Sequence, residues 1–140
     1  MTPPPVLYIE DDENDVLLMR QAWARVNVQN PLLVVSNGQE ALDHLAENAP
    51  YADRADHRMP CLVLLDLKLP KVSGLEVLRF IRSQPTLIGL RVVVLSSSNT
   101  PADINAAHGL RIDAYLVKSS RFDEMLAAVD TLNVYWLRGR

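Results

Sequence analysis

Five polar side chains come at the ends of four short apolar stretches of the sequence: Glu10, Asp11, Asp66, Ser96 and Lys118. Carboxylate oxygens are ligands that suit Mg²⁺, an ion that also keeps several of its waters. A carboxylate beside such an ion can act as a nucleophile toward phosphorus and become an acyl phosphate. An ammonium and a hydroxyl nearby could donate hydrogen bonds to the phosphoryl oxygens. Together these side chains indicate a site that binds a divalent cation and handles a phosphoryl group.

Each of these residues has a simpler explanation when it is taken alone. An acidic run such as 10–15 after a strand commonly forms a solvated helix N-terminus, which the helix dipole favours. Asp66 could cap a turn, Ser96 could be a turn residue, and Lys118 could be a surface charge. The order of the residue types along the chain, with acids first, then serine, then lysine, each after its own apolar stretch, is what favours a shared site.

The apolar stretches predict five short strands, at residues 6–9, 32–35, 61–66, 92–95 and 114–117. The segment from Leu62 to Leu65 is apolar at every position, which is typical of a strand that buries both faces, as in parallel sheets. Pro70 cannot extend that strand, so the chain must turn after Asp66.

Helical segments separate the predicted strands, and four of them begin with capping signals: Asn37, Ser73, Thr100 and Ser120. The last helix is predicted to start at Ser120 and to continue to Trp136. The alternation of strands and helices predicts an α/β protein, a doubly wound parallel sheet covered on both faces. Ligands bind at the carboxyl edge of such sheets. The five polar side chains are therefore expected to converge at one edge.

Length and composition fit a single domain that resides in the cytosol. The chain has 140 residues, 49% of them hydrophobic, and a net charge of −3. Without a basic block, a dedicated nucleic-acid surface is not expected. No apolar run approaches the ~18 residues that a membrane span needs, and the N-terminus lacks the pattern of a signal peptide. His44, His57 and His108 show no metal-binding spacing and are expected at the surface.

The chain resembles the response-regulator receiver domains of two-component signalling over nearly its whole length. The matching segments are Ile9 to Asp11, Leu64 to Pro70 with Gly74, Val93 to Ser97, and Ala114 to Lys118. The resemblance implies the flavodoxin-like receiver fold, with five parallel strands in the order 2-1-3-4-5 and five helices. It also implies that residues 1–140 form one receiver domain, with its core at about 5–137 and no output domain.

This resemblance implies that Asp66 accepts a phosphoryl group from a histidine kinase. The protein would then be a phosphoacceptor, with no enzymatic activity beyond its own phosphorylation and dephosphorylation. Mg²⁺ is the implied cofactor, and Mn²⁺ or Ca²⁺ could replace it in a crystal. The implied metal ligands are Asp66, Asp11, Glu10 through a water, and the backbone carbonyl of Lys68.

The same resemblance assigns roles to three further residues. Ser96 and Lys118 would bind the phosphoryl oxygens. Tyr115 would be the aromatic side chain that turns inward when Ser96 is drawn to the phosphate. One departure from the family pattern is Ser119, where proline is usual. Because a cis peptide bond costs ~2.5–4 kcal/mol before a residue other than proline, the Lys118–Ser119 bond is predicted to be trans.

Within the receivers, the chain is most similar to single-domain regulators paired with phytochrome kinases. The features behind this likeness are Glu10-Asp11 at the first acidic position, Leu69-Pro70-Lys71 after the phosphoacceptor, the long polar loop before the third strand and the aromatic C-terminal end. The partner that this likeness implies is a histidine kinase, with a bacteriophytochrome as the candidate.

Two other functions remain open from the sequence. One is a receiver-like interaction module that is not phosphorylated, for which Ser119 is the only support. The other is an aspartate-nucleophile phosphatase. Such enzymes usually carry the nucleophile after the first strand, with a second aspartate two residues later. Here Asp66 follows the third strand and position 68 is lysine.

The C-terminal run from Val134 to Leu137 predicts a homodimer. Four consecutive apolar residues cannot all be buried on one packed face of a helix, because each residue turns the helix by ~100°. Exposed apolar patches commonly mark interfaces. The dimer is expected to form through the fourth helix, the fifth strand and the last helix. The alternative is that the end of the helix packs against its own domain.

Overall fold

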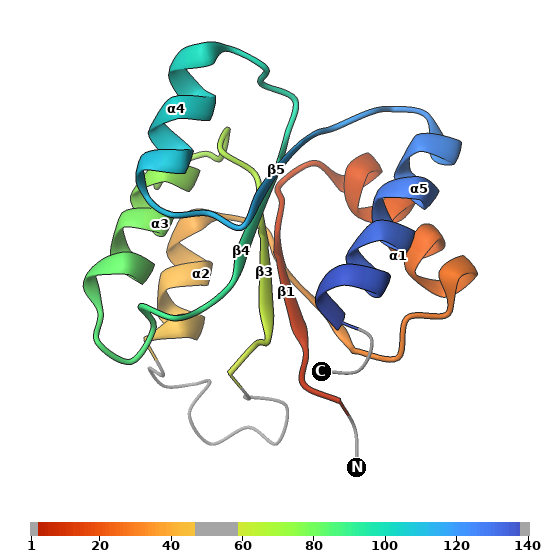
Figure 1. Ribbon diagram of the computed structural model, residues 1–140, viewed down its shortest axis with the longest axis horizontal. Helices are drawn as coiled ribbons and strands as arrows, with labels where there is room; N and C mark the ends of the chain where they lie inside the picture. The colour runs from red at the N-terminus through yellow and green to blue at the C-terminus, as the bar shows by residue number, and fades with distance from the viewer. Residues whose placement is uncertain (1–2, 47–58, 138–140) are drawn as a thin grey trace.

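Five parallel strands form a central sheet in the order β2-β1-β3-β4-β5 (Figure 1). The computed structural model describes residues 3–46 and 59–137. The strands are β1 (Val6–Ile9), β2 (Leu32–Val35), β3 (Leu62–Leu65), β4 (Val92–Ser96) and β5 (Ala114–Val117). The helices are α1 (Glu13–Val26), α2 (Gly38–Leu45), α3 (Gly74–Ser83), α4 (Pro101–Gly109), α5 (Phe122–Leu132) and the π-helix η1 (Asn133–Leu137). The predicted fold class and strand order are confirmed.

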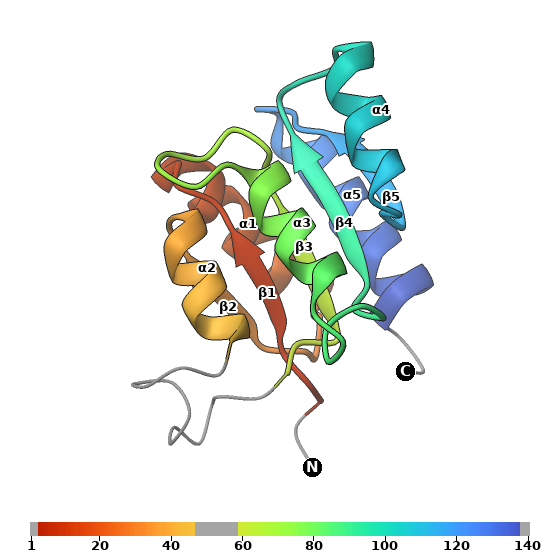
Figure 2. The ribbon, with the colours of Figure 1, turned by 90° about the vertical axis from the view of Figure 1, so that its left-hand side faces the viewer.

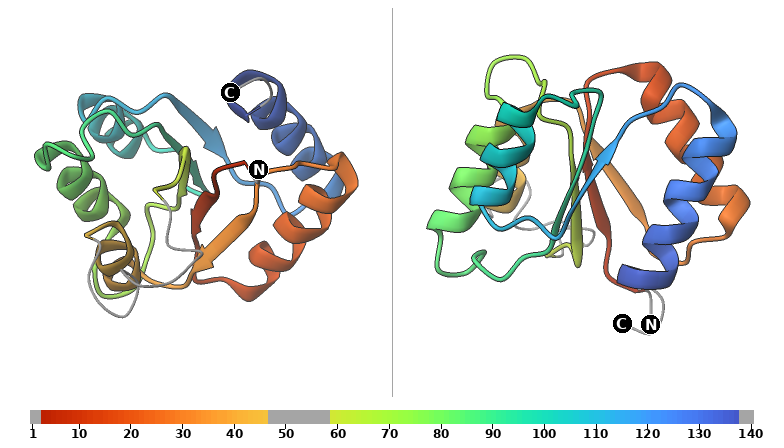
Figure 3. Two further views of the ribbon diagram at one scale, coloured as in Figure 1. Left: turned by 90° about the horizontal axis from the view of Figure 1, so that it is seen from below. Right: turned by 45° about the horizontal axis from the view of Figure 1, so that its top comes forward.

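The helices form two layers, with α1 and α5 on one face of the sheet and α2, α3 and α4 on the other (Figures 2 and 3). Alternate strand residues supply the two cores. Leu7 and Ile9 pack toward α2 and α3, whereas Val6 and Tyr8 pack toward α1 and α5. This double burial explains why β1, β3 and β4 are apolar at nearly every position. Among the described residues, no helix is long and apolar enough to cross a membrane.

Three of the four predicted helix caps are present. The side chains of Asn37, Ser73 and Thr100 accept hydrogen bonds from the backbone N–H three residues later. The prediction for Ser120 is wrong, because α5 begins after Arg121, whose side chain makes no capping bond. Ser119 takes over the turn instead, and its hydroxyl accepts a hydrogen bond of 3.1 Å from the Arg121 N–H.

The C-terminal apolar run packs against its own domain at two positions and stays exposed at two others, and the dimer remains a prediction. Leu137 is buried and Trp136 packs against the core between α1 and α5. Val134 and Tyr135 stay 45% and 63% exposed. The regular helix ends at Leu132, not at Trp136, and η1 follows it.

The histidine prediction is wrong for one of the two described residues. His44 is buried in α2, with 7% of its surface exposed, because it follows Ala41 on the face of the helix that packs on the sheet. His108 is exposed, as expected. His57 and most of the polar loop before β3 lie outside the described residues.

Candidate functional site

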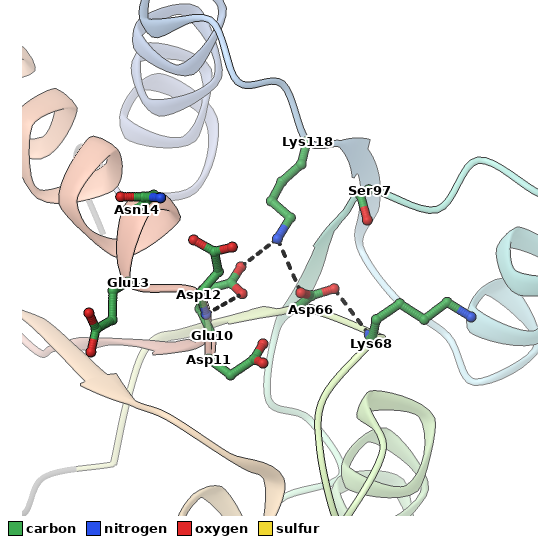
Figure 4. Close-up of a pocket in the computed structure, with 9 residues that line it drawn as sticks. All are labelled: Glu10, Asp11, Asp12, Glu13, Asn14, Asp66, Lys68, Ser97 and Lys118. Carbon is green, nitrogen blue, oxygen red and sulfur yellow. Dashed lines mark hydrogen bonds and ion pairs between the residues drawn. The ribbon is translucent and has the colours of Figure 1, made fainter.

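A cleft of about 520 Å³ lies at the carboxyl edge of the sheet (Figure 4). Its walls include the residues that follow β1, β3 and β5, namely Glu10, Asp11, Asp66, Lys68 and Lys118. They meet because the parallel strands all end at this edge, and β1 and β3 are hydrogen-bonded neighbours in register. The predicted convergence of acids and lysine is therefore present.

Three carboxylates in the cleft have the spacing of a cation site. Glu10, Asp11 and Asp66 each offer an oxygen, and these oxygens lie within 4.8 Å of one another. Glu10 and Asp66 are buried, with 1% and 3% of their surface exposed, whereas Asp11 faces solvent. Crowded carboxylates repel one another unless a positive charge joins them. The oxygen donors and the one open side of the cluster fit a divalent cation such as Mg²⁺.

Burial perturbs Glu10 strongly. The Tyr8 hydroxyl donates to Glu10 Oε1 at 3.4 Å, and the Asp12 N–H donates to Glu10 Oε2 at 3.2 Å. Burial raises the pKa of Glu10 to about 7, against the lowering effect of its hydrogen bond from Lys118, and the charge of Asp66 raises it further. Near neutral pH, Glu10 is therefore expected to lose its proton when a divalent cation binds beside it.

Lys118 lies at the centre of the acidic groups. Its Nζ is 2.8 Å from Glu10 Oε1, 3.1 Å from Asp66 Oδ2 and 2.6 Å from Asp15 Oδ2. Burial lowers the pKa of Lys118, but the hydrogen bonds to Asp15 and Glu10 outweigh this and raise it above the ordinary value. Lys118 reaches the site although Ser119 follows it, so the sequence departure at that position does not misplace the amine.

Asp66 sits in a tight turn that a glycine makes possible. The Lys68 N–H donates to Asp66 Oδ1 at 3.1 Å, and the Gly74 N–H donates to the Leu67 carbonyl at 3.1 Å. A Cβ at position 74 would overlap the Asp66 carbonyl oxygen, so only glycine lets α3 start this close to Asp66. The Lys68 side chain points out of the cleft to Asp103, with Nζ 3.1 Å from Oδ2.

Ser96 ends β4 and Tyr115 lies in β5, and neither of them lines the cleft. Ser96 is fully buried, and its hydroxyl accepts a hydrogen bond of 3.3 Å from the Ser98 N–H. Ser97 is the serine that lines the cleft. The Tyr115 hydroxyl donates to the Ser98 carbonyl at 2.8 Å, which ties β5 to the loop between β4 and α4.

Asp15 and Ser97 lie at the site but were not among the predicted site residues. Asp15 belongs to the acidic run for which a solvated helix terminus was the simpler explanation, but it makes the shortest contact to Lys118. Its place in the first turn of the helix after β1 was the available signal, since that turn opens onto the edge of the sheet. Ser97 was passed over in favour of Ser96, and two adjacent serines at a strand end carry no pattern that separates their roles.

Comparison with known proteins identifies similar sequences over nearly the whole chain. The response regulator receiver domain family matches residues 6–130. The chain is 32% identical over 132 residues to a probable methanogenesis regulatory protein, FilR2 of Methanothrix harundinacea, covering 94% of this chain and 83% of that protein. It is 31% identical over 135 residues to response regulator Rcp1 of Synechocystis, covering 96% and 90% of the two chains.

Solved structures give the same result. The phosphorylated cyanobacterial phytochrome response regulator RcpA superposes with a TM-score of 0.90 at 34% identity, covering 99% of this chain and 96% of that chain. The Mn²⁺-bound form of Rcp1 gives 0.88 at 30% identity, covering 99% and 97%. The bacteriophytochrome response regulator RtBRR gives 0.80 at 39% identity, covering 96% and 80%.

Proposed function

Because the chain belongs to the response regulator receiver family, we propose that Asp66 accepts a phosphoryl group from the phosphohistidine of a histidine kinase. The observation that carries this proposal is the surroundings of Asp66. Its carboxylate is buried, lies within 4.8 Å of two other acidic side chains and is 3.1 Å from the Lys118 ammonium. A group that is both a nucleophile and part of a cation site suits phosphoryl transfer.

In this reaction an oxygen of Asp66 forms a bond to phosphorus while the bond between phosphorus and the imidazole nitrogen breaks. The imidazole keeps the electron pair of that bond and leaves with the kinase. Lys118 and Ser96 are proposed to bind the phosphoryl oxygens, and the Lys68 carbonyl is proposed to join Glu10, Asp11 and Asp66 as a cation ligand. A bound Mg²⁺ would offset the negative charge that the phosphoryl group adds to the carboxylates.

We propose that the signal passes on through a change in the loop between β4 and α4. Ser96 precedes this loop, its hydroxyl accepts a hydrogen bond from Ser98 within the loop, and the Tyr115 hydroxyl donates to the Ser98 carbonyl. If Ser96 moves toward a phosphoryl group on Asp66, the Tyr115 hydroxyl loses its present acceptor geometry. The side chain would then turn inward, which would alter the surface of α4 and β5.

A phytochrome-type kinase is the proposed partner. RcpA is described as a phytochrome response regulator and RtBRR as a bacteriophytochrome response regulator, and both are more than 30% identical to this chain. The partner would be a protein and not a nucleic acid, because the net charge is −3 and no basic block is present in the sequence. We further propose that the protein acts in the cytosol, as a phosphoacceptor whose only reactions are its own phosphorylation and dephosphorylation.

A homodimer through α4, β5 and α5 is also proposed. Three exposed apolar side chains on β5 and the C-terminal helical end support it: Val117, Val134 and Tyr135. Solvent-exposed apolar side chains favour association when a partner surface can cover them.

Incubation with acetyl phosphate and Mg²⁺, followed by intact-mass analysis, tests the proposed function. A single stable adduct of one phosphoryl group, lost in the Asp66→Asn variant, is the expected result. Continuous release of phosphate over many turnovers would instead support the aspartate-nucleophile phosphatase. No adduct from acetyl phosphate or from a cognate kinase would support an interaction module that is not phosphorylated.

A further inference from the structure

The ammonium of Lys118 is fully committed in this structure. It has three protons, and it contacts three carboxylates, of Asp15, Glu10 and Asp66, at 2.6, 2.8 and 3.1 Å. The contact to Asp15 is the shortest of the three and the contact to Asp66 is the longest. Figure 4 shows Lys118 descending from β5 with its amine between Glu10 and Asp66. Asp15 is thus the nearest of the three acceptors, and it is the one that does not belong to the acidic cation cluster.

Asp15 is a fixed point rather than a mobile surface acid. Its backbone N–H donates to Asp12 Oδ1 at 3.0 Å, which anchors it in the first turn of α1. Its side chain is 20% exposed, and that of Lys118 is 10% exposed. The backbone of Lys118 is also fixed, since its N–H donates to the Ser96 carbonyl at 2.7 Å. With both backbones fixed, only the flexible side chain of Lys118 is free to change direction.

The residue after Lys118 contributes no contact to the cleft. The Ser119 hydroxyl donates to Glu124 Oε1 at 2.9 Å and accepts from the Arg121 N–H, so it faces the start of α5. The direction of the Lys118 stem is therefore set by the three carboxylates. Without the charge of Asp15, the amine would have two charged acceptors left, Glu10 and Asp66, and it would move closer to them.

Such a shift would tighten the contacts that Lys118 already makes with the two buried carboxylates of the cation cluster. We propose that Asp15 is a positioning residue: by sharing the Lys118 ammonium with Glu10 and Asp66, it keeps the amine from binding these two carboxylates more tightly, so that a divalent cation can compete for them and phosphoryl transfer can proceed. This inference rests on the proposed function of the site, and Asp15 acts in it only through Lys118.

A double-mutant cycle tests whether Asp15 acts through Lys118. The variants are Asp15→Asn, Lys118→Gln and their combination, measured by calorimetric titration with Mg²⁺ and by the rate of phosphorylation from acetyl phosphate at saturating Mg²⁺. In the protein that keeps Lys118, we expect Asp15→Asn to weaken Mg²⁺ binding and to slow phosphorylation, each by about three- to ten-fold. This is the usual size of the coupling between two groups in contact. In the Lys118→Gln background both effects should shrink to less than about two-fold.

Two further variants separate positioning from charge and folding. Glu13→Gln removes one negative charge from the same helix turn, where Glu13 is exposed and its carboxylate points away from Lys118 (Figure 4). It should change Mg²⁺ affinity much less than Asp15→Asn does. Asp15→Glu keeps a carboxylate within reach of the amine and should retain most of the wild-type affinity and rate.

The proposal is overturned if Asp15→Asn behaves like Glu13→Gln, or if its effect on Mg²⁺ affinity is equally large with Gln at position 118. The titration with Mg²⁺ does not depend on phosphoryl transfer. If the wild-type protein formed no acyl phosphate, the proposed function would fail while the Mg²⁺ cycle still decided the role of Asp15.

Discussion

At the scale of single residues, burial separates two neighbouring acids that the sequence presents as a pair. Glu10 is covered by the Tyr8 hydroxyl and the Lys118 amine, whereas Asp11 faces solvent. Burial raises the pKa of Glu10 from an ordinary 4.5 to about 7. In the folded protein Glu10 therefore holds a proton over a pH range in which the unfolded chain has released it.

The stability of the metal-free protein is expected to depend on pH through Glu10. Because the folded pKa lies above the unfolded one, the contribution of Glu10 is greatest below about pH 4.5 and is lost as the pH rises through about 7. Urea unfolding in the presence of a chelator should show the wild type losing stability relative to Glu10→Gln across this window. Parallel stability curves for the two proteins would contradict the expectation.

Asp66→Asn is expected to abolish acyl phosphate formation while the protein remains folded. The amide preserves the shape of the side chain, but it is not a nucleophile toward phosphorus. Intact mass after treatment with acetyl phosphate measures the loss. Asp43→Asn on α2 is the matched control, since Asp43 is outside the cleft and contacts Gln39. Uptake of phosphate by Asp66→Asn at the wild-type rate would show that another residue is the acceptor.

Sequence reasoning located site residues best where they end a strand. Glu10, Asp11, Asp66 and Lys118 follow apolar runs, so the geometry of a parallel sheet brings them together. Asp15 follows no strand, and its contact with Lys118 depends on how α1 is rotated over the edge of the sheet. That rotation is a tertiary property, which a local pattern of residues does not encode.

At the scale of secondary-structure elements, the start of α3 controls the shape of the turn that holds Asp66. Replacing Gly74 with alanine should destabilise the protein by ~1–3 kcal/mol, because the new Cβ meets the Asp66 carbonyl and the Leu67 backbone. Chemical denaturation measures the change. The variant should also slow phosphorylation, since the turn that orients Asp66 must move.

Gly109→Ala is the control for this prediction. Nothing lies within 4 Å of a Cβ built at Gly109, which is the last residue of α4. This substitution should leave stability unchanged or raise it by up to ~1 kcal/mol, as expected for alanine in place of glycine in a helix. Equal losses from both substitutions would mean that the close approach at Gly74 is not what the site requires.

The strands and most helices were predictable because each has a local signal. Asn37, Ser73 and Thr100 cap their helices as their spacing indicates. The start of α5 was misplaced because Ser119 and Ser120 both offer a hydroxyl, and only the path of the chain from β5 decides which one forms the turn. Strand order came from the resemblance to receivers, since strands buried on both faces do not reveal their neighbours.

At the scale of the whole molecule, the exposed apolar side chains at the C-terminal end are expected to support the proposed dimer. Val134→Ser combined with Tyr135→Ser should lower the dimer fraction in light scattering, because these side chains are 45% and 63% exposed in one chain. The control is Ile88→Ser, a side chain that is 50% exposed between α3 and β4. A wild-type protein that stays monomeric at high concentration, with and without a phosphoryl analogue, would exclude the dimer.

The two tryptophans of the chain both lie in the layer formed by α1 and α5. Trp23 is buried, and its indole N–H donates to the Asn30 carbonyl at 2.8 Å, while Trp136 stacks edge-on with Tyr135 at 6.0 Å between ring centroids. Indole fluorescence therefore reports on the layer of α1 and α5 and not directly on α2, α3 and α4. An emission change on phosphorylation would mean that a change at the site had reached the layer of α1 and α5.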